Sequence, residues 1–220
     1  LEETSPNIIE LLPILKQKAK MILIKTSPYM DITEGLRQLP GTSEVHIVEH
    51  DKQCKEVLFV INQKTSNQES VQIISANLDK NTIYQAPYPS HNVMDVPLST
   101  PLTYIYEPGP ALMKSELHTN YAIENNLNKL APLTHLYTSD TYLPDYPGRC
   151  LKYLKSLSAN KKAIHAALPD KKANISARNF PERPDQLRKK WGVKDGGHFT
   201  LFACTLGEKE HVILLCTSTK

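Results

Sequence analysis

The chain has 220 residues, of which 40% are hydrophobic and 22% are charged, and its formal net charge at neutral pH is +3. This apolar content suffices for a hydrophobic core and excludes a wholly disordered chain, and the length suits one or two domains. No apolar run approaches the roughly 18 residues of a membrane span, and no signal peptide is recognisable. Because the first residue is Leu1 rather than Met, we expect the chain to be part of a longer protein.

The first 62 residues predict the end of an α/β sheet. A helix is expected to begin at Ser5-Pro6. The apolar run Met21–Ile24 suits a strand that is buried on both faces of a parallel sheet. A short helix from Asp31 to Leu39 follows. The strands Glu44–Glu49 and Lys55–Asn62 are separated by too few residues for a parallel crossover, so they predict an antiparallel hairpin.

The middle of the chain is rich in proline and less regular. Strands are expected at Val71–Leu78 and Thr82–Ala86, and the segment from Pro87 to Pro101 is typical of a connector. Residues 102–147 predict a small mixed unit in which Glu107-Pro108-Gly109-Pro110 forms a turn. Its strands are expected at Thr103–Tyr106 and His135–Thr138, and its helices at Ala111–Leu117 and Asn120–Lys129.

The C-terminal third predicts a β-α-β-α-β-β unit with its helices on one face of the sheet. Its strands are expected at Arg149–Ser156, Lys172–Ala177, Phe199–Thr205 and His211–Cys216, and its helices at Ser158–Leu168 and Arg183–Trp191.

Charge is unevenly distributed along the chain. Residues 1–148 contain 11 Lys and Arg against 17 Asp and Glu, which gives −6, whereas residues 149–220 contain 15 against 6, which gives +9. A large single-sign excess of this kind suggests a module that binds a polyanion.

The four cysteines, Cys54, Cys150, Cys204 and Cys216, are too sparse for a disulfide scaffold, and no two have CxxC spacing. We expect them to be reduced and mostly buried, which implies a cytoplasmic protein. The sequence has no glycine-rich dinucleotide motif, no P-loop, no metal-spaced Cys/His set and no nucleophile elbow. A complete active site is therefore not visible, and no metal is expected.

One polar loop is a candidate for the substrate side of a site. Ligands of open α/β sheets bind beyond the carboxyl ends of the strands, and the loop after Met21–Ile24 carries Lys25, Ser27, Pro28 and Asp31. The alternative is that Ser27-Pro28 only ends the strand and that Asp31 caps the next helix.

The order of elements in residues 1–62 resembles the C-terminal part of a class I S-adenosylmethionine-dependent methyltransferase. That fold ends with a helix, its fifth strand, a helix, and a sixth and seventh strand that form an antiparallel hairpin. Four segments look more specifically like a bacterial subfamily of these enzymes: Thr4-Ser5-Pro6-Asn7, Ile24-Lys25-Thr26-Ser27-Pro28-Tyr29-Met30-Asp31-Ile32, Val45-His46-Ile47-Val48 and Cys54-Lys55-Glu56.

That subfamily carries a small ferredoxin-like insert and a THUMP-like domain after its catalytic domain, and the rest of the chain resembles both. The segments similar to the insert are Tyr104-Ile105-Tyr106-Glu107-Pro108 and His135-Leu136-Tyr137-Thr138-Ser139. The segments similar to the THUMP-like domain are Ala173-Asn174-Ile175, Arg178-Asn179-Phe180-Pro181, Leu187-Arg188-Lys189-Lys190, Lys194-Asp195-Gly196-Gly197 and Leu201-Phe202-Ala203.

The resemblance implies S-adenosylmethionine as the cofactor, with its binding motifs upstream of Leu1. It also implies that the THUMP-like domain positions an RNA, for which tRNA is one candidate. The basic residues that we expect to contact RNA are Lys161, Lys162, Lys171, Lys172, Arg178, Arg183, Arg188, Lys189, Lys190 and Lys194. The alternative for this set is a solvated charged face.

Two details of this basic third lead to further expectations. Consecutive helical residues point about 100° apart, so at least two of Arg188, Lys189 and Lys190 must face solvent. Four aromatic residues are candidates for stacking on bases: Tyr153, Phe180, Trp191 and Phe199. The positions of Trp191 at a helix end and of Phe199 and Phe202 in a hairpin are more typical of a core.

The predicted fold class is α/β plus α+β. It comprises the C-terminal strands of a Rossmann-like methyltransferase sheet in residues 1–101, a ferredoxin-like unit in 102–147 and a THUMP-like β-α-β-α-β-β domain in 148–220. We predict that the chain is the C-terminal fragment of an S-adenosylmethionine-dependent methyltransferase that modifies RNA. Two alternatives stay open: a non-enzymatic RNA-binding or scaffold protein, and a protein-interaction module that binds no nucleic acid. No membrane partner is expected.

Overall fold

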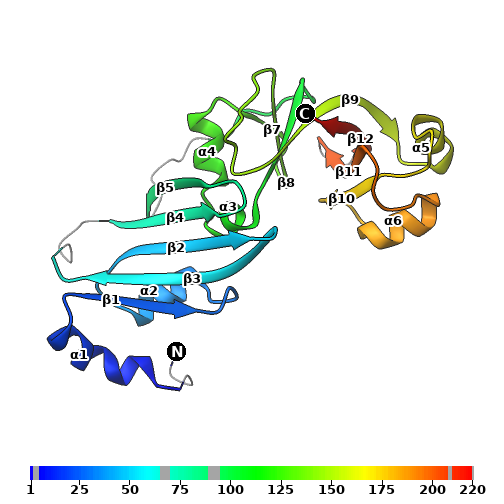
Figure 1. Cartoon of the computed structure of the whole chain (residues 1–220). Helices are drawn as coiled ribbons and strands as arrows, with labels where there is room; N and C mark the ends of the chain where they lie inside the picture. Colours follow the sequence, from blue (N-terminus) through cyan, green and yellow to red (C-terminus); the bar gives the residue numbers. More distant parts are fainter. Residues whose placement is uncertain (2–4, 65–69, 89–94, 208–209, 220) are drawn as a thin grey trace. The chain divides into compact units, whose positions relative to one another are not determined.

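The structure, a computed structural model, describes residues 1, 5–64, 70–88, 95–207 and 210–219. These residues form two compact units, Leu1–Val93 with Gly109–Tyr121, and Met94–Pro108 with Ala122–Lys220. Each unit contains one mixed β-sheet (Figure 1). No described helix has both the length and the apolar composition of a membrane span.

The first unit contains a five-stranded sheet and helices that pack against it. The strands are β1 (Met21–Thr26), β2 (Thr42–His50), β3 (Gln53–Asn62), β4 (Val71–Asn77) and β5 (Thr82–Tyr88), and the helices are α1 (Ile8–Lys18), α2 (Ile32–Gln38) and α3 (Pro110–Lys114). The strand order is β1-β3-β2-β4-β5. Because β3 runs antiparallel to β1 and β2, and β2 runs parallel to β4, the carboxyl ends of β1, β2 and β4 lie at the same edge.

The core of this unit lies on one face of the sheet. Leu12 of α1 and Leu112 of α3 belong to the same buried cluster as Val45 of β2 and Phe59 of β3. The predicted hairpin of β2 and β3 and the predicted helix after Asp31 are both confirmed.

Two expectations for this unit are wrong in detail. Asn7, not Ser5, caps α1, because its side chain accepts the N–H groups of Ile9 and Glu10. Strand β1 is not buried on both faces: it alternates between buried and exposed residues and pairs antiparallel with β3. An unbroken apolar run therefore does not establish burial on both faces, because one face of β1 is exposed. Thr4, which belongs to one quoted motif, lies outside the described residues.

The second unit contains a seven-stranded sheet in the order β10-β11-β12-β9-β6-β8-β7. The helix α4 (His118–Glu124) begins in the first unit's segment and ends in the second's. The strands are β6 (Tyr104–Pro108), β7 (Asn128–Ala131), β8 (Thr134–Ser139), β9 (Gly148–Ser158), β10 (Asn174–Arg178), β11 (Phe199–Leu206) and β12 (Glu210–Ser218), and the further helices are α5 (Lys161–Ala167) and α6 (Pro184–Trp191).

The run from β9 to β12 confirms the predicted β-α-β-α-β-β order. One face of β11 and β12 packs against α5 and α6, where Leu187 and Trp191 meet Leu201. The opposite face is also buried, because Phe202 shares a cluster with Leu136 of β8. The helices therefore cover one face, as predicted, and strands of the same sheet cover the other.

Three local expectations in residues 102–170 are wrong. Glu107 and Pro108 continue β6 instead of forming a turn, because both pair with β9. The predicted helix to Lys129 ends at Glu124, and β7 follows, because Asn128 and Lys129 pair with β8. Asn160, not Ser158, caps α5. Part of the predicted connector, residues 89–94, lies outside the described residues.

Candidate nucleic-acid interface

The ten basic residues that the sequence marks as RNA contacts all belong to the second unit. Nine are exposed, and Arg188 is half-buried. Lys189 and Lys190 both face solvent, which confirms the helical argument for this stretch.

Three lysines gather where the chain enters β10, and we call Lys171, Lys172 and Lys194 the lysine cluster. Lys172 and Lys194 form a parallel β-bridge, and the Lys194 N–H donates to the Lys171 carbonyl at 2.9 Å. Gly197 allows this close approach, since a Cβ there would lie 3.2 Å from the Lys172 Cβ. Backbone contacts therefore bring these three exposed lysine residues together.

A second group of cations lies where α5 meets the C-terminus of α6. Helix α6 ends at Gly192, which has a φ of 63°, and His165 of α5 donates to the Trp191 carbonyl at 2.6 Å. The Lys161 ammonium lies beside Gly192. The last turn of α6 carries Arg188, Lys189 and Lys190. The C-terminal end of a helix has a partial negative charge, which favours these cations.

Three of the ten residues form ion pairs with acidic side chains of the same unit. Arg188 lies 2.9 Å from Asp185 and 2.6 Å from Asp195. Lys190 pairs with Glu182, and Arg178 with Glu107. Among the described residues, seven of the ten form no ion pair: Lys161, Lys162, Lys171, Lys172, Arg183, Lys189 and Lys194.

Glu107 is the centre of a charged network that the sequence did not reveal. Its side chain is only 5% exposed and contacts two guanidinium groups, those of Arg149 and Arg178. Arg149 also donates to Ser176 Oγ at 2.7 Å and lies over the Phe202 ring. This network joins β6, β9 and β10, so Arg149 and Arg178 contribute to the fold of the domain.

The predicted substrate-side loop lies at the carboxyl end of β1, as expected from the position of that strand. Lys25 forms an ion pair with Glu56 at 3.0 Å. Ser27 Oγ accepts the Tyr29 N–H at 3.2 Å across Pro28, which lies between them in sequence. Asp31 accepts the Glu34 N–H at 2.8 Å and caps α2, which is the structural alternative for this residue.

A small hollow lies beside Asp31, with Thr33, Tyr88 and Lys114 in its lining. Its volume is about 70 Å³. Small-molecule sites usually measure about 300–1,000 Å³. This hollow therefore does not fit S-adenosylmethionine.

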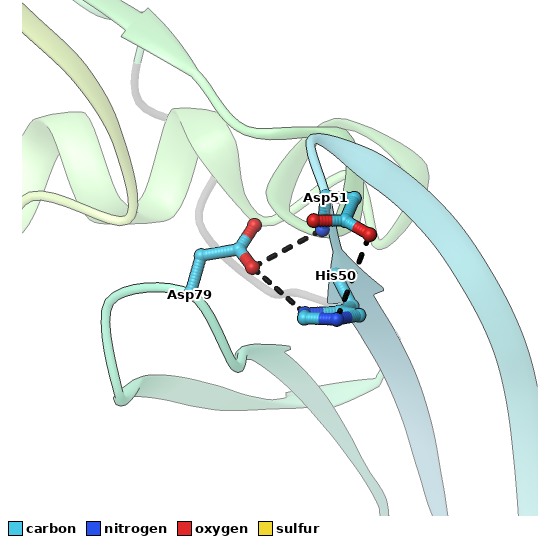
Figure 2. Close-up of side chains that lie close together, drawn as sticks. All are labelled: His50, Asp51 and Asp79. Atoms are coloured by element: carbon cyan, nitrogen blue, oxygen red, sulfur yellow. Dashed lines mark hydrogen bonds and ion pairs between the residues drawn. The ribbon is translucent and has the colours of Figure 1, made fainter.

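His50, Asp51 and Asp79 lie close together at the turns that follow β2 and β4 (Figure 2). The Asp79 carboxylate accepts hydrogen bonds from the backbone N–H groups of Asp51 and Lys52 at 3.1 and 3.2 Å. His50 Nδ1 lies 2.8 Å from Asp79 Oδ1. The bonds from these backbone N–H groups, that of Asp51 foremost, hold the pKa of Asp79 below its ordinary value. Because Asp51 and Lys52 both have positive φ, the cluster is explained by the tight turn that it stabilises.

The cysteines and aromatic residues divide between core and surface. Cys204 and Cys216 are buried, and burial raises the pKa of both thiols, that of Cys204 to about 12. Trp191 and Phe202 are at most 1% exposed, so neither can stack on a base. Phe180 is half-buried.

Comparisons with known proteins agree with this architecture. Residues 148–218 match the family described as "THUMP domain-like", and residues 104–147 match the family described as "ferredoxin-like domain". The chain is similar to the crystal structure of a "putative methyltransferase" from Porphyromonas gingivalis W83, with 28% sequence identity and a TM-score of 0.89. The match covers all of this chain and 56% of that chain.

A search of curated proteins gave no match. The chain thus carries a ferredoxin-like domain followed by a THUMP-like domain, and over its whole length it resembles a structure described as a "putative methyltransferase".

Proposed function

We propose that this chain is the C-terminal part of an S-adenosylmethionine-dependent methyltransferase that acts on RNA, and that its THUMP-like domain positions the RNA. The observation that carries the proposal is the set of exposed basic residues, most of them outside ion pairs, in the segment that matches the THUMP-like family. Polyphosphate backbones are bound by surfaces of this kind.

The first unit supports the methyltransferase part of the proposal. Its elements follow the order helix, strand, helix, antiparallel hairpin, and the neighbour that it resembles is described as a "putative methyltransferase". On β1, which pairs with β3 alone among the described residues, Met21 and Leu23 are 62% and 61% exposed. Exposed apolar residues on an edge strand favour a sheet that continues or is covered in the whole protein.

In this proposal residues 1–101 complete the catalytic domain, 102–147 form the insert and 148–220 bind RNA. S-adenosylmethionine would supply the methyl group, but the residues beside Asp31 form no cavity of its size. We expect calorimetry to detect no micromolar binding of S-adenosylmethionine to these 220 residues. Micromolar binding would contradict the placement of the cofactor motifs upstream.

Fluorescence anisotropy with labelled tRNA tests the RNA-binding part. We expect the 220-residue chain to bind, with an affinity that falls linearly with salt on a double logarithmic plot. Absence of binding at low salt would contradict it. Transfer of labelled methyl groups to tRNA by the full-length protein would separate an enzyme from a non-enzymatic RNA-binding protein.

A further inference from the structure

The second unit contains an open hollow of about 560 Å³ where β10 and β11 end and β12 begins. Leu133, in the turn between β7 and β8, is 74% exposed at its margin. The hollow is large enough for a planar aromatic ligand. It is lined by Leu133, Ala177, Asn179, Phe180, Pro181, Thr205 and His211.

Two rings lie beside each other in the lining of this hollow. The ring centroids of Phe180 and His211 are 5.1 Å apart and tilted by 58°. His211 is exposed and Phe180 is half-buried, so both remain accessible to a ligand. Tilted aromatic pairs of this kind offer faces and edges on which another planar ring can pack.

Hydrogen bonds hold these rings in place. The hydroxyl of Thr205, which is 7% exposed, donates to the Asn179 carbonyl, and its oxygen lies 3.1 Å from His211 Nδ1. The Asn179 carbonyl can only accept, so the hydroxyl proton of Thr205 is used in that bond. The Thr205 oxygen therefore accepts a hydrogen bond from His211 Nδ1. Thr134 contacts the same strand end, because its hydroxyl donates to the Thr205 carbonyl at 2.6 Å.

Polar groups and cations surround the rings. Asn179 directs its amide nitrogen to Thr134 Oγ1 at 3.4 Å, which leaves its side-chain oxygen without a partner among the described residues. Arg178, next to Asn179, keeps 44% of its side chain exposed while it pairs with Glu107. The Lys129 ammonium is bonded to the carbonyl of Pro132, next to Leu133, and Glu210 adds one exposed acid beside His211.

We propose that this hollow binds one unpaired nucleobase of an RNA, which stacks on Phe180 and His211. Asn179 Oδ1 would accept a hydrogen bond from the base, and Arg178 would contact the adjoining phosphate. Proteins that bind single-stranded nucleic acids combine aromatic platforms and cations in this way. The inference rests on the proposed RNA-binding function and adds to it the kind of nucleotide that is bound.

The test compares a labelled single-stranded oligouridylate with a duplex RNA in anisotropy titrations of the 220-residue chain. Phe180→Leu and His211→Ala should each weaken single-strand binding about 5- to 100-fold, because base stacking accounts for energies of that order. Duplex binding and its salt dependence should not change. The control Tyr142→Ala removes a ring that is 42% exposed in the second unit and does not line the hollow, and it should change neither affinity.

The possible failures are distinguishable. If both variants bind the single strand like the wild type, the nucleobase site is wrong and the RNA-binding function stands. If both variants bind single-stranded and duplex RNA more weakly by the same factor, the hollow contacts the RNA backbone without recognising a base, and the inference is again wrong. If the wild type binds no RNA, both proposals fail. Circular dichroism checks that each variant is folded. If Phe180→Leu unfolds, the His211→Ala variant tests the inference, because His211 is exposed.

Discussion

The guanidinium of Arg188 lies 2.6 Å from the carboxylate of Asp195, so α6 is tied to the turn that precedes β11. Asp185, one turn earlier in α6, lies 2.9 Å from the same guanidinium. Arg188 therefore differs from its neighbour Lys189, which is exposed and forms no ion pair among the described residues. The basic stretch of α6 combines a residue that stabilises the fold with one that can reach phosphate.

This difference predicts unequal effects on stability for two neighbouring substitutions. Arg188→Ala should lower the free energy of unfolding by about 1 kcal/mol, because it removes two ion pairs that a half-buried guanidinium forms with exposed carboxylates. Lys189→Ala should change it by less than about 0.5 kcal/mol. Urea denaturation measures both. Equal stability losses in the two variants would show that Arg188 has no special structural role.

Removal of the Glu107 carboxylate should destabilise the second unit. Glu107→Gln leaves the guanidinium groups of Arg149 and Arg178 without their shared anion, at a cost of about 1–3 kcal/mol. The matched control is Glu56→Gln, which removes an exposed pair with Lys25 and should cost less than about 0.5 kcal/mol. The urea midpoints of the two variants test the prediction, and a stability of Glu107→Gln equal to that of the control would refute it.

Local patterns predicted much of the fold, and they failed where a long-range contact decides. The alternation of strands and helices after Gly148 was visible because Gly, Pro and apolar runs mark each boundary. Asn128 and Lys129 look helical in sequence, and only their pairing with β8 makes them a strand. The place of His211 beside Phe180 likewise depends on the β11–β12 register, which opposes His211 to Thr205.

The same limit applies to the candidate interface. The ten cations that the sequence predicts as RNA contacts are exposed or half-buried in the structure. Which of them pair with acids could not be predicted, since Glu107 and Arg178 are brought together only by the order of strands in the sheet.

Gly35 of α2 provides a test of packing against helix propensity. Alanine is preferred over glycine in a helix by about 1 kcal/mol, but a Cβ at Gly35 would lie 2.1 Å from the Phe59 Cζ. We expect Gly35→Ala to be destabilising by about 1–3 kcal/mol through overpacking.

The same substitution in a Phe59→Leu background should cost less, because the clashing ring is gone. Thermal or urea unfolding of the four chains completes the cycle. A stabilising Gly35→Ala would contradict the packing described for α2.

Glu49 predicts a pH dependence of stability. Burial raises the pKa of this carboxyl above its ordinary value of 4.5, although the Ala111 N–H partly opposes the shift. The folded state therefore holds the proton at a pH where the unfolded state has released it, so this contribution to stability is lost as pH rises above about 4.5.

The variant Glu49→Gln lacks this titration and keeps an acceptor for Ala111. Its stability relative to the wild type should increase between acidic and neutral pH, as measured by urea denaturation at several pH values. A difference that does not vary with pH would contradict the raised pKa of Glu49.

The most direct test of the account is the salt dependence of tRNA binding by a variant of the lysine cluster. The variant Lys171→Ser/Lys172→Ser/Lys194→Ser removes three exposed cations and keeps the Cβ that packs against Gly197. The control Lys18→Ser/Lys20→Ser/Lys55→Ser removes the same charge from exposed positions of the first unit. If the cluster contacts phosphates, its variant should bind more weakly, and its slope on the double logarithmic salt plot should decrease by about 0.7–0.9 per lost contact, while the control keeps the wild-type slope. Equal slopes for both variants and the wild type would contradict the assignment of RNA binding to this surface.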